Sequence, residues 1–193
     1  MNPNSIAILT NPHPCGHIVY PYTDENLVAR AVCLFTSAGV QNGEGIILIM
    51  TADHCEPFER RLQLEGFNVE ALKRSGQLVC AKSEELLQQF LTNGSVDEDL
   101  FKTTVSGLIA RAAAGGRNGK PRKVRCFGEM VSQLRATDLT ATTRLEELWN
   151  ELIDEHSVAL LCTYALQDGD DQVPQSLVTL HSHNIEQKPA AVV

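Results

Sequence analysis

Residues 45–66, GIILIMTADHCEPFERRLQLEG, decide the fold class because they join a buried strand directly to a helix. Residues 46–51 form a short apolar run of the kind found in strands that are buried on both faces. Beyond this run, Asp53 and Glu56 are spaced as a variant capping box, and Gly66 is a typical helix stop. A strand followed at once by a capped helix predicts an α/β protein.

The same alternation recurs along the chain. Four more short apolar runs predict strands, at 17–22, 77–81, 123–127 and 158–164. Amphipathic patterns between the predicted strands indicate helices, which implies crossover connections. We therefore expect a mostly parallel sheet of about five strands with helices on both faces.

The last strong helical pattern divides its residues between two faces. Leu145, Leu148, Trp149, Leu152 and Ile153 form an apolar stripe that is typical of core packing. The other face carries polar residues and is expected to meet solvent; it comprises Glu146, Glu147, Asn150, Glu151 and Asp154.

A chain of 193 residues is expected to form one compact domain. Residues 1–16 contain three prolines and no sustained period, and we interpret them as an N-terminal arm. Residues 17–185 form the predicted domain. Residues 186–193 are expected to be a disordered tail.

Composition excludes several classes of protein. The formal net charge of −8 disfavours binding to nucleic acid or to an anionic membrane surface. The longest apolar run is far below the roughly 20 residues of a membrane helix, and the first residues lack a signal-peptide pattern. Six cysteines lie far apart without a C-x-x-C pair, as expected of reduced thiols in a cytoplasmic protein.

Ligands of open α/β sheets bind at the carboxyl ends of the strands, and five residues there are candidates for a binding cleft. They are His17, Tyr20 and Tyr22 of the first strand, Thr51 after the second strand and Glu129 after the fourth strand. An aromatic wall with one acid and one histidine suits a small, partly apolar organic ligand. Alternatively, the tyrosines pack under the first helix and His17 closes a hydrogen bond.

Glu129 has two interpretations of its own. A carboxylate directly beyond a buried strand is where a P-loop protein places its metal-side acid. Alternatively, it stabilises the first turn of the helix that follows it, since a carboxylate favours the positive end of the helix dipole.

Nucleotide and nucleophile motifs are absent from the sequence. The nearest approach to G-x-x-x-x-G-K-[ST], at Gly119-Lys120, precedes a strand instead of following one. The basic residues between 117 and 125, Arg125 included, favour a solvated loop, with an anion or partner contact as the alternative. Adjacent His54 and Cys55 do not face each other on a helix, which disfavours a catalytic pair.

The H-x-H pair His181 and His183 is a weak candidate for metal binding, with His17 or His13 as a further ligand. No spaced set of four ligands is visible in the sequence. We expect no catalytic residues, no resident metal and no cofactor.

Four motifs together resemble one known family. They are CGHIVY at 15–20, RCFGEMV at 125–131, RLEELWN at 144–150 and HSH at 181–183. In this order they look like the MEDS domain, the DcmR-type sensory domain of methanogens and methylotrophs, over about residues 15–185. The resemblance implies a RecA-like, three-layer architecture similar to the core of KaiC-type ATPases.

The residues at the position of the KaiC phosphate loop, 21–26, contain neither glycine nor lysine and include two carboxylates, Asp24 and Glu25. The resemblance therefore implies a RecA-like sheet that has lost its nucleotide site and can bind another ligand. MEDS domains occur in DcmR-like repressors and as sensory modules of histidine kinases.

By this resemblance, the expected function is a non-enzymatic sensory domain in bacterial signal transduction or transcriptional regulation. Its ligand would be a small organic compound, including one-carbon or halogenated compounds. Its partner would be a histidine kinase, a transcription regulator or a second copy of the chain. A divergent RecA/KaiC-type nucleotide-binding protein and a ligand-free interaction module remain alternatives.

Overall fold

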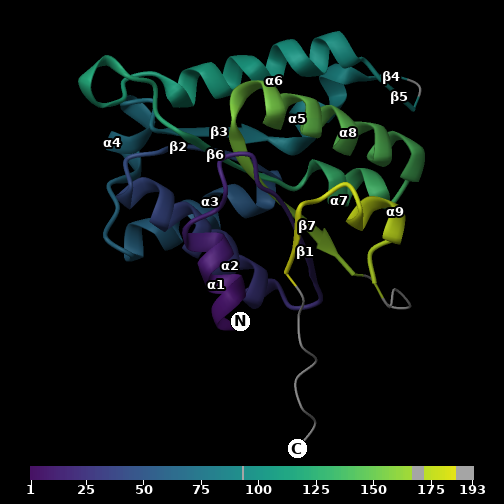
Figure 1. Cartoon of the computed structure of the whole chain (residues 1–193), viewed down its shortest axis with the longest axis horizontal. Helices are drawn as coiled ribbons and strands as arrows, with labels where there is room; N and C mark the ends of the chain where they lie inside the picture. Colours follow the sequence, from purple (N-terminus) through teal and green to yellow (C-terminus); the bar gives the residue numbers. More distant parts are fainter. Residues whose placement is uncertain (93, 167–171, 186–193) are drawn as a thin grey trace, which may run out of the picture.

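The computed structural model describes residues 1–92, 94–166 and 172–185, which form three layers with a parallel sheet between two layers of helices (Figure 1). The sheet has six strands in the order β3-β2-β6-β7-β1-β8, and all neighbours pair in parallel. The strands are β1 (His17–Tyr22), β2 (Gly45–Met50), β3 (Leu78–Lys82), β6 (Val124–Gly128), β7 (Val158–Ala165) and β8 (His183–Asn184). The α/β prediction is confirmed, with β8 as an additional strand beyond the five expected.

The helices divide between the two faces of the sheet (Figure 1). One face, the α2 face, packs against α1 (Pro3–Thr10), α2 (Glu25–Gln41), α3 (Ala52–Leu64) and α4 (Val69–Arg74). The opposite face, the α8 face, packs against α5 (Ser83–Phe90), α6 (Glu98–Ala113), α7 (Met130–Arg135), α8 (Leu139–His156) and α9 (Gln175–Val178). A short hairpin, β4 (Leu91–Thr92) and β5 (Ser95–Val96), and the 3-10 turn η1 (Arg117–Gly119) complete the fold.

Both faces of the sheet are buried, which explains the nearly continuous apolar strands. In β1, Ile18 and Tyr20 belong to the core of the α2 face, whereas Val19 belongs to the core of the α8 face. On the α8 face, Trp149 lies edge-to-face against Phe101, with ring centroids 5.5 Å apart. The predicted core stripe of α8 is therefore confirmed.

Two polar residues that the sequence placed in solvent are buried. Glu146 of α8 has no exposed surface, although its neighbour Glu147 reaches solvent. Arg125 of β6 is 2% exposed, so its assignment to a solvated basic loop is wrong. Both side chains are buried because each has polar partners in the interior, which local periodicity does not reveal.

The first sixteen residues, expected as an arm, contain α1 and pack on α2. Arg125 holds them there: Nη1 donates to the carbonyls of Leu9 and Phe35 at 3.0 and 3.1 Å, and Nη2 donates to the carbonyl of Thr10 at 3.1 Å. Nε of Arg125 pairs with the Glu44 carboxylate. One buried guanidinium therefore joins α1, α2 and the sheet.

The connections after two neighbouring strands leave toward opposite faces. The chain leaves β2 into α3 on the α2 face, and it leaves β6 into α7 on the α8 face. Where the connections after two neighbouring strands leave in opposite directions, a crevice opens at the carboxyl edge of the sheet. Open α/β folds bind their ligands in this crevice. Thr51 and Glu129 stand directly after these two strands.

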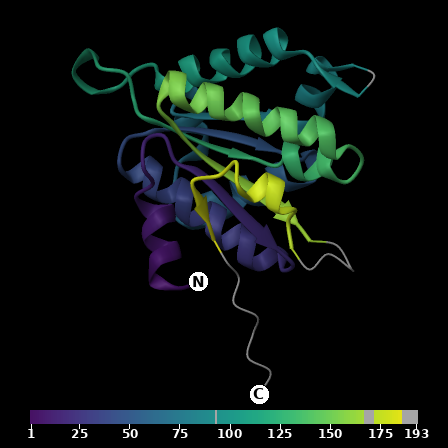
Figure 2. The same cartoon turned by 45° about the vertical axis from the view of Figure 1, so that its right-hand side comes forward.

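The C-terminal segment returns to the sheet edge, where β8 pairs with β1 (Figure 2). The tail predicted for 186–193 lies outside the described residues. No helix in the part of the chain that the structure describes is both long and apolar enough to cross a bilayer.

Candidate functional site

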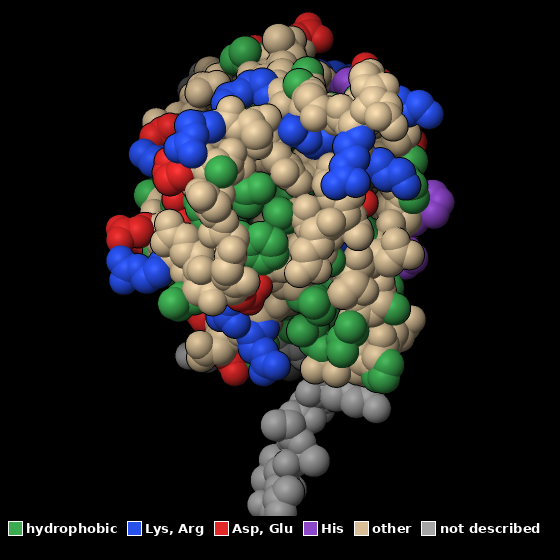
Figure 3. Space-filling model, turned by 90° about the vertical axis from the view of Figure 1, so that its left-hand side faces the viewer, with side chains coloured by type: hydrophobic (Ala, Val, Ile, Leu, Met, Phe, Trp, Pro, Cys, Tyr) green, Lys and Arg blue, Asp and Glu red, His purple; other side chains and the backbone are tan. Residues whose placement is uncertain are grey.

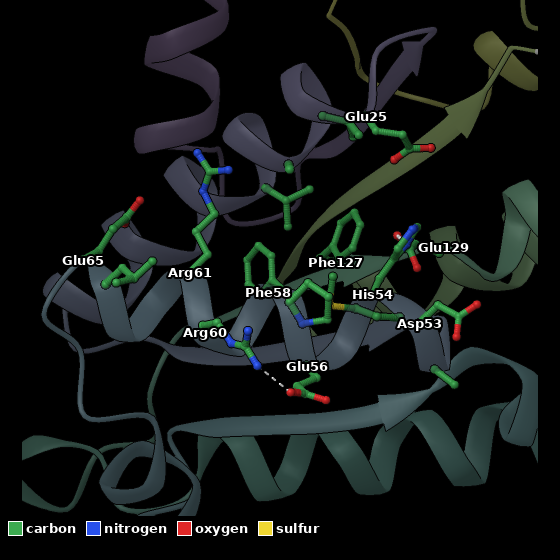
Figure 4. A pocket seen from close by; sticks show the side chains of 17 residues that line it. Glu25, Asp53, His54, Glu56, Phe58, Arg60, Arg61, Glu65, Phe127 and Glu129 are labelled. Atoms are coloured by element: carbon green, nitrogen blue, oxygen red, sulfur yellow. Dashed lines mark hydrogen bonds and ion pairs between the residues drawn. The ribbon is translucent and has the colours of Figure 1, made fainter.

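A pocket of about 920 Å³ lies between α2 and α3, above the ends of β2 and β6. Its apolar wall includes Val28 and Val32 of α2, Met50 of β2, Phe58 of α3 and Phe127 of β6. Hydrophobic side chains gather in the middle of the face seen in Figure 3, with charged side chains around them. In Figure 4 the two phenylalanines lie centrally, with Glu129 and His54 at one end of the pocket and Arg61 and Glu65 at the other.

Glu129 makes the hydrogen bonds that hold together the end of the pocket near His54. Its Oε2 accepts a hydrogen bond from the Thr51 amide at 2.7 Å, and its Oε1 lies 2.8 Å from His54 Nδ1. Its own amide donates to the Ile49 carbonyl at 3.0 Å, which ties the turn after β6 to β2.

The carboxylate of Glu129 caps a different helix from the one predicted. Glu129 stands at the start of α7, but its side chain makes no capping hydrogen bond there. Instead it accepts from the amide of Thr51, the N-cap residue of α3, where a carboxylate also compensates the helix dipole. The interaction joins the ends of two neighbouring strands across the crevice.

His54 is the titratable partner of Glu129 at this end of the pocket. The hydrogen bond to Glu129 raises the pKa of the His54 imidazole above its usual value, against partial burial, which lowers it. The His54 side chain is 42% exposed, so it stays in contact with solvent at the pocket mouth. The pair can donate or accept a hydrogen bond toward a ligand group.

The second end of the pocket is anchored by Glu65, which follows α3. Its carboxylate accepts from Ser37 Oγ at 2.7 Å and from Cys33 Sγ at 2.9 Å. Burial, with this hydrogen bond, raises the pKa of the Cys33 thiol to about 11, so the thiol stays protonated and unreactive near neutral pH. Arg61 of α3 supplies positive charge beside Glu65.

Of the five predicted site residues, the structure joins two directly, since the Thr51 amide donates to Glu129, and only Glu129 lines the pocket. Tyr22 is buried at the end of β1, where burial together with the charges of Glu25 and Glu129 raises its pKa well above its usual range. Tyr20 is 1% exposed and packs in the core of the α2 face, as the alternative interpretation held.

His17 does not belong to this cleft. Its ring lies on the α8 face beside Glu146 and Cys162, so the predicted five-residue cleft does not form. The reason is the pleat of β1: residues an odd number apart point to opposite faces, which separates His17 from Tyr20 and Tyr22.

Two pocket residues escaped the sequence analysis. His54 was considered only with its neighbour Cys55, although its place in the first turn of a helix after a strand was the signal that could have revealed it. Phe127 was treated as an ordinary strand residue, and nothing local distinguishes a pocket wall from a core position.

The turn between β1 and α2, where the resemblance predicts the position of a KaiC-type phosphate loop, carries two carboxylates. Asp24 caps α2 by accepting from the Asn26 amide at 2.8 Å, and Glu25 follows in the first turn. A negative cap and a negative first turn oppose the binding of phosphate at this helix end.

The parallel sheet between two layers of helices defines a RecA-like α/β domain, and comparison with a solved structure agrees. A KaiC-like protein from the hyperthermophilic archaeon Pyrococcus horikoshii OT3 superposes with a TM-score of 0.58 at 11% identity, covering 88% of this chain and 69% of that one. At this identity the likeness concerns the fold alone. A comparison with curated protein sequences returns no match.

The family is shown by sequence. The profile of the MEDS family, the methanogen/methylotroph DcmR sensory domain, matches residues 16–182. The chain belongs to the MEDS family, as its four motifs predicted.

Proposed function

We propose that this protein is a non-enzymatic sensory domain that binds a small organic molecule in the pocket between α2 and α3. The observation that carries the proposal is a pocket with an apolar wall and the hydrogen-bonded His54–Glu129 pair at one end. Such sites bind ligands by burying apolar surface, while a few placed polar groups fix their orientation. Membership of a sensory-domain family supports the same role.

The size of the pocket limits the ligand. At about 920 Å³ it is far larger than a one-carbon compound, since a water molecule occupies about 30 Å³ of liquid and a one-carbon compound only a few times more. We therefore infer a larger, partly apolar molecule with one group that hydrogen-bonds to His54 or Glu129. A one-carbon compound, halogenated or not, would leave most of the pocket to water.

The signalling step follows from the position of the pocket. A ligand held between α2 and α3 contacts both helices, and it favours whichever arrangement of them it binds more tightly. We propose that a cytoplasmic histidine kinase, a transcription regulator or a second copy of the chain reads this arrangement.

Thermal unfolding with a panel of small organic molecules tests the ligand site. A ligand at 100 times its Kd stabilises the folded state by about 2.7 kcal/mol. Ala29→Phe, which places a ring in the pocket, and Glu129→Gln should each abolish the shift. Glu70→Gln, at an exposed glutamate away from the pocket, is the matched control and should leave the shift intact.

A ligand whose stabilisation survives Ala29→Phe binds elsewhere and contradicts the proposal. Stabilisation by ATP with magnesium that is abolished by a substitution in residues 21–26 would support the nucleotide-binding alternative instead. If no ligand stabilises the chain and Ala29→Phe is more stable than the wild type, the pocket is a packing defect, and the ligand-free interaction module gains support.

A further inference from the structure

A second cluster of ionisable side chains lies on the opposite face of the sheet from the pocket. It brings together His17 of β1, Glu146 of α8, Cys162 of β7 and His181, which follows α9. Their candidate ligand atoms all lie within 4.8 Å of one another. His17, Glu146 and Cys162 are at most 2% exposed, and the His181 side chain is fully buried.

The hydrogen bonds of His17 fix which ring nitrogen faces the cluster. Asn150 Nδ2 donates to the Leu180 carbonyl at 3.0 Å, so the amide oxygen of Asn150 must be the atom that lies 2.8 Å from His17 Nδ1. An amide oxygen only accepts, and Nδ1 of His17 therefore carries the proton. In the neutral ring, Nε2 presents its lone pair to the cluster.

His181 is oriented in the same way. Its Nδ1 lies 2.9 Å from the Leu177 carbonyl, which can only accept, so Nδ1 donates and Nε2 is the free nitrogen. His181 Nε2 is buried without a hydrogen-bond partner of acceptable geometry, although it lies 3.3 Å from Glu146 Oε1. Imidazoles that donate one N–H to an outer acceptor and point the other nitrogen inward are typical of metal ligands.

Glu146 and Cys162 supply the remaining donors. Tyr164 Oη donates to Oε1 of Glu146, which orients the carboxylate so that Oε2 faces His17 and Cys162. Glu146 Oε2 lies 3.2 Å from His17 Nε2 and 3.7 Å from Cys162 Sγ. Cys162 Sγ lies 3.4 Å from His17 Nε2.

The separations among His17, Glu146 and Cys162 match three of the six edges of a four-ligand coordination shell. Zinc bonds of about 2.0–2.1 Å to nitrogen or oxygen and about 2.3 Å to sulfur place tetrahedral ligand atoms about 3.3 Å apart, or about 3.6 Å where one is sulfur. A carboxylate and a thiolate also neutralise the two positive charges of the ion, so the buried site would carry no net charge. Charge neutrality matters because the interior penalises an unpaired charge.

We propose that His17, Glu146, Cys162 and His181 form a closed, four-ligand site for a divalent transition-metal ion, Zn²⁺ foremost. A set of two imidazoles, one thiolate and one carboxylate suits zinc, and the burial of all four leaves no open position for a substrate. Binding would release the thiol proton of Cys162 to solvent as the Zn–S bond forms. The ion would tie the segment after α9 to β1, β7 and α8.

The site revises the weaker metal hypothesis drawn from H-x-H. His181 turns inward to the cluster, whereas His183 lines a shallow groove with His13 and Ile8 at the N-terminal segment. The two histidines therefore do not act as a pair. Asn150 and Tyr164 lie outside the ligand set and position its members.

The test uses the full chain after removal of metal by a chelator, with Zn²⁺ as the probe. Because Cys15, Cys55 and Cys80 are partly exposed thiols, all three are first replaced by serine. We expect one Zn²⁺ per chain and a higher melting temperature, which the chelator reverses. His181→Ala and Cys162→Ser should each weaken binding at least about 100-fold, and Asn150→Ala about 10- to 100-fold. His183→Ala and His54→Ala are the matched controls and should bind as the parent does.

The visible spectrum of the Co²⁺-loaded protein distinguishes a metal ligand from a residue that only stabilises the fold. With Co²⁺, the parent should show the sulfur-to-cobalt charge-transfer band and the visible bands of a tetrahedral ion, and Cys162→Ser should lose the charge-transfer band. The proposal is overturned if the folded, metal-free parent takes up no Zn²⁺. It is equally overturned if uptake persists in His181→Ala and Cys162→Ser, or is lost in His183→Ala.

Discussion

Arg125→Met tests how the N-terminal segment is held to the sheet. The guanidinium donates to three backbone carbonyls, those of Leu9, Thr10 and Phe35, and pairs with the Glu44 carboxylate. Methionine fills much of the same volume but donates nothing. The substitution therefore removes a charged donor from carbonyls of α1 and α2 and from the Glu44 carboxylate.

The expected cost follows from breaking a buried ion pair on one side only. Such a change destabilises a protein by about 3–5 kcal/mol, because the remaining charge keeps its desolvation penalty. For a chain of this length, each kcal/mol lowers the melting temperature by about 2–4 °C, so the expected drop is about 6–20 °C. Residues 3–10 should also become more accessible to proteases, since α1 loses its anchor.

Urea unfolding and a protease time course measure both effects. Lys123→Met is the matched control, because Lys123 is an exposed residue directly before β6. Its free energy of unfolding should stay within about 0.5 kcal/mol of the wild-type value. A double variant with Glu44→Gln should cost less than the sum of the single variants, because the two groups interact. Arg125→Met within 1 kcal/mol of the wild type, with α1 still protected, would refute the reasoning.

Three further predictions follow from named contacts. Trp149→Ala should cost about 3–5 kcal/mol in urea unfolding, because it empties a packed site against Phe101, and a melting temperature within two degrees of the wild type would contradict this. Glu129→Gln should lower the His54 pKa in an NMR titration. Since that pKa is raised on folding, the pair stabilises the wild type below the unfolded pKa of about 6.5 and loses this contribution as the pH rises through the folded pKa; an unchanged pH dependence in Glu129→Gln would count against it. ATP with magnesium should neither be hydrolysed nor raise the melting temperature, and turnover abolished by Glu129→Gln would reverse this.

The family and the fold class were both readable from the sequence, because each rests on local patterns. The strand predicted at 46–51, the core stripe around Trp149 and the four motifs of the MEDS family need only neighbouring residues for their recognition. The alternation rule would also have separated His17 from Tyr20 and Tyr22, since an odd spacing in a strand reverses the face. Grouping them in one cleft was an error of interpretation.

The tertiary structure alone decided which polar groups are buried and what they contact. Glu146 lies on the polar side of a helical pattern, and Arg125 stands in a run of basic residues, so each reads as a solvent-exposed residue. Their partners lie far away in the chain: Glu146 contacts His17 and His181, and Arg125 contacts Leu9. A buried polar group is stable only where such partners meet it, and contacts across this separation leave no trace in a local period. The carboxylate of Glu129 likewise turned to α3 because β2 and β6 are neighbours in the sheet.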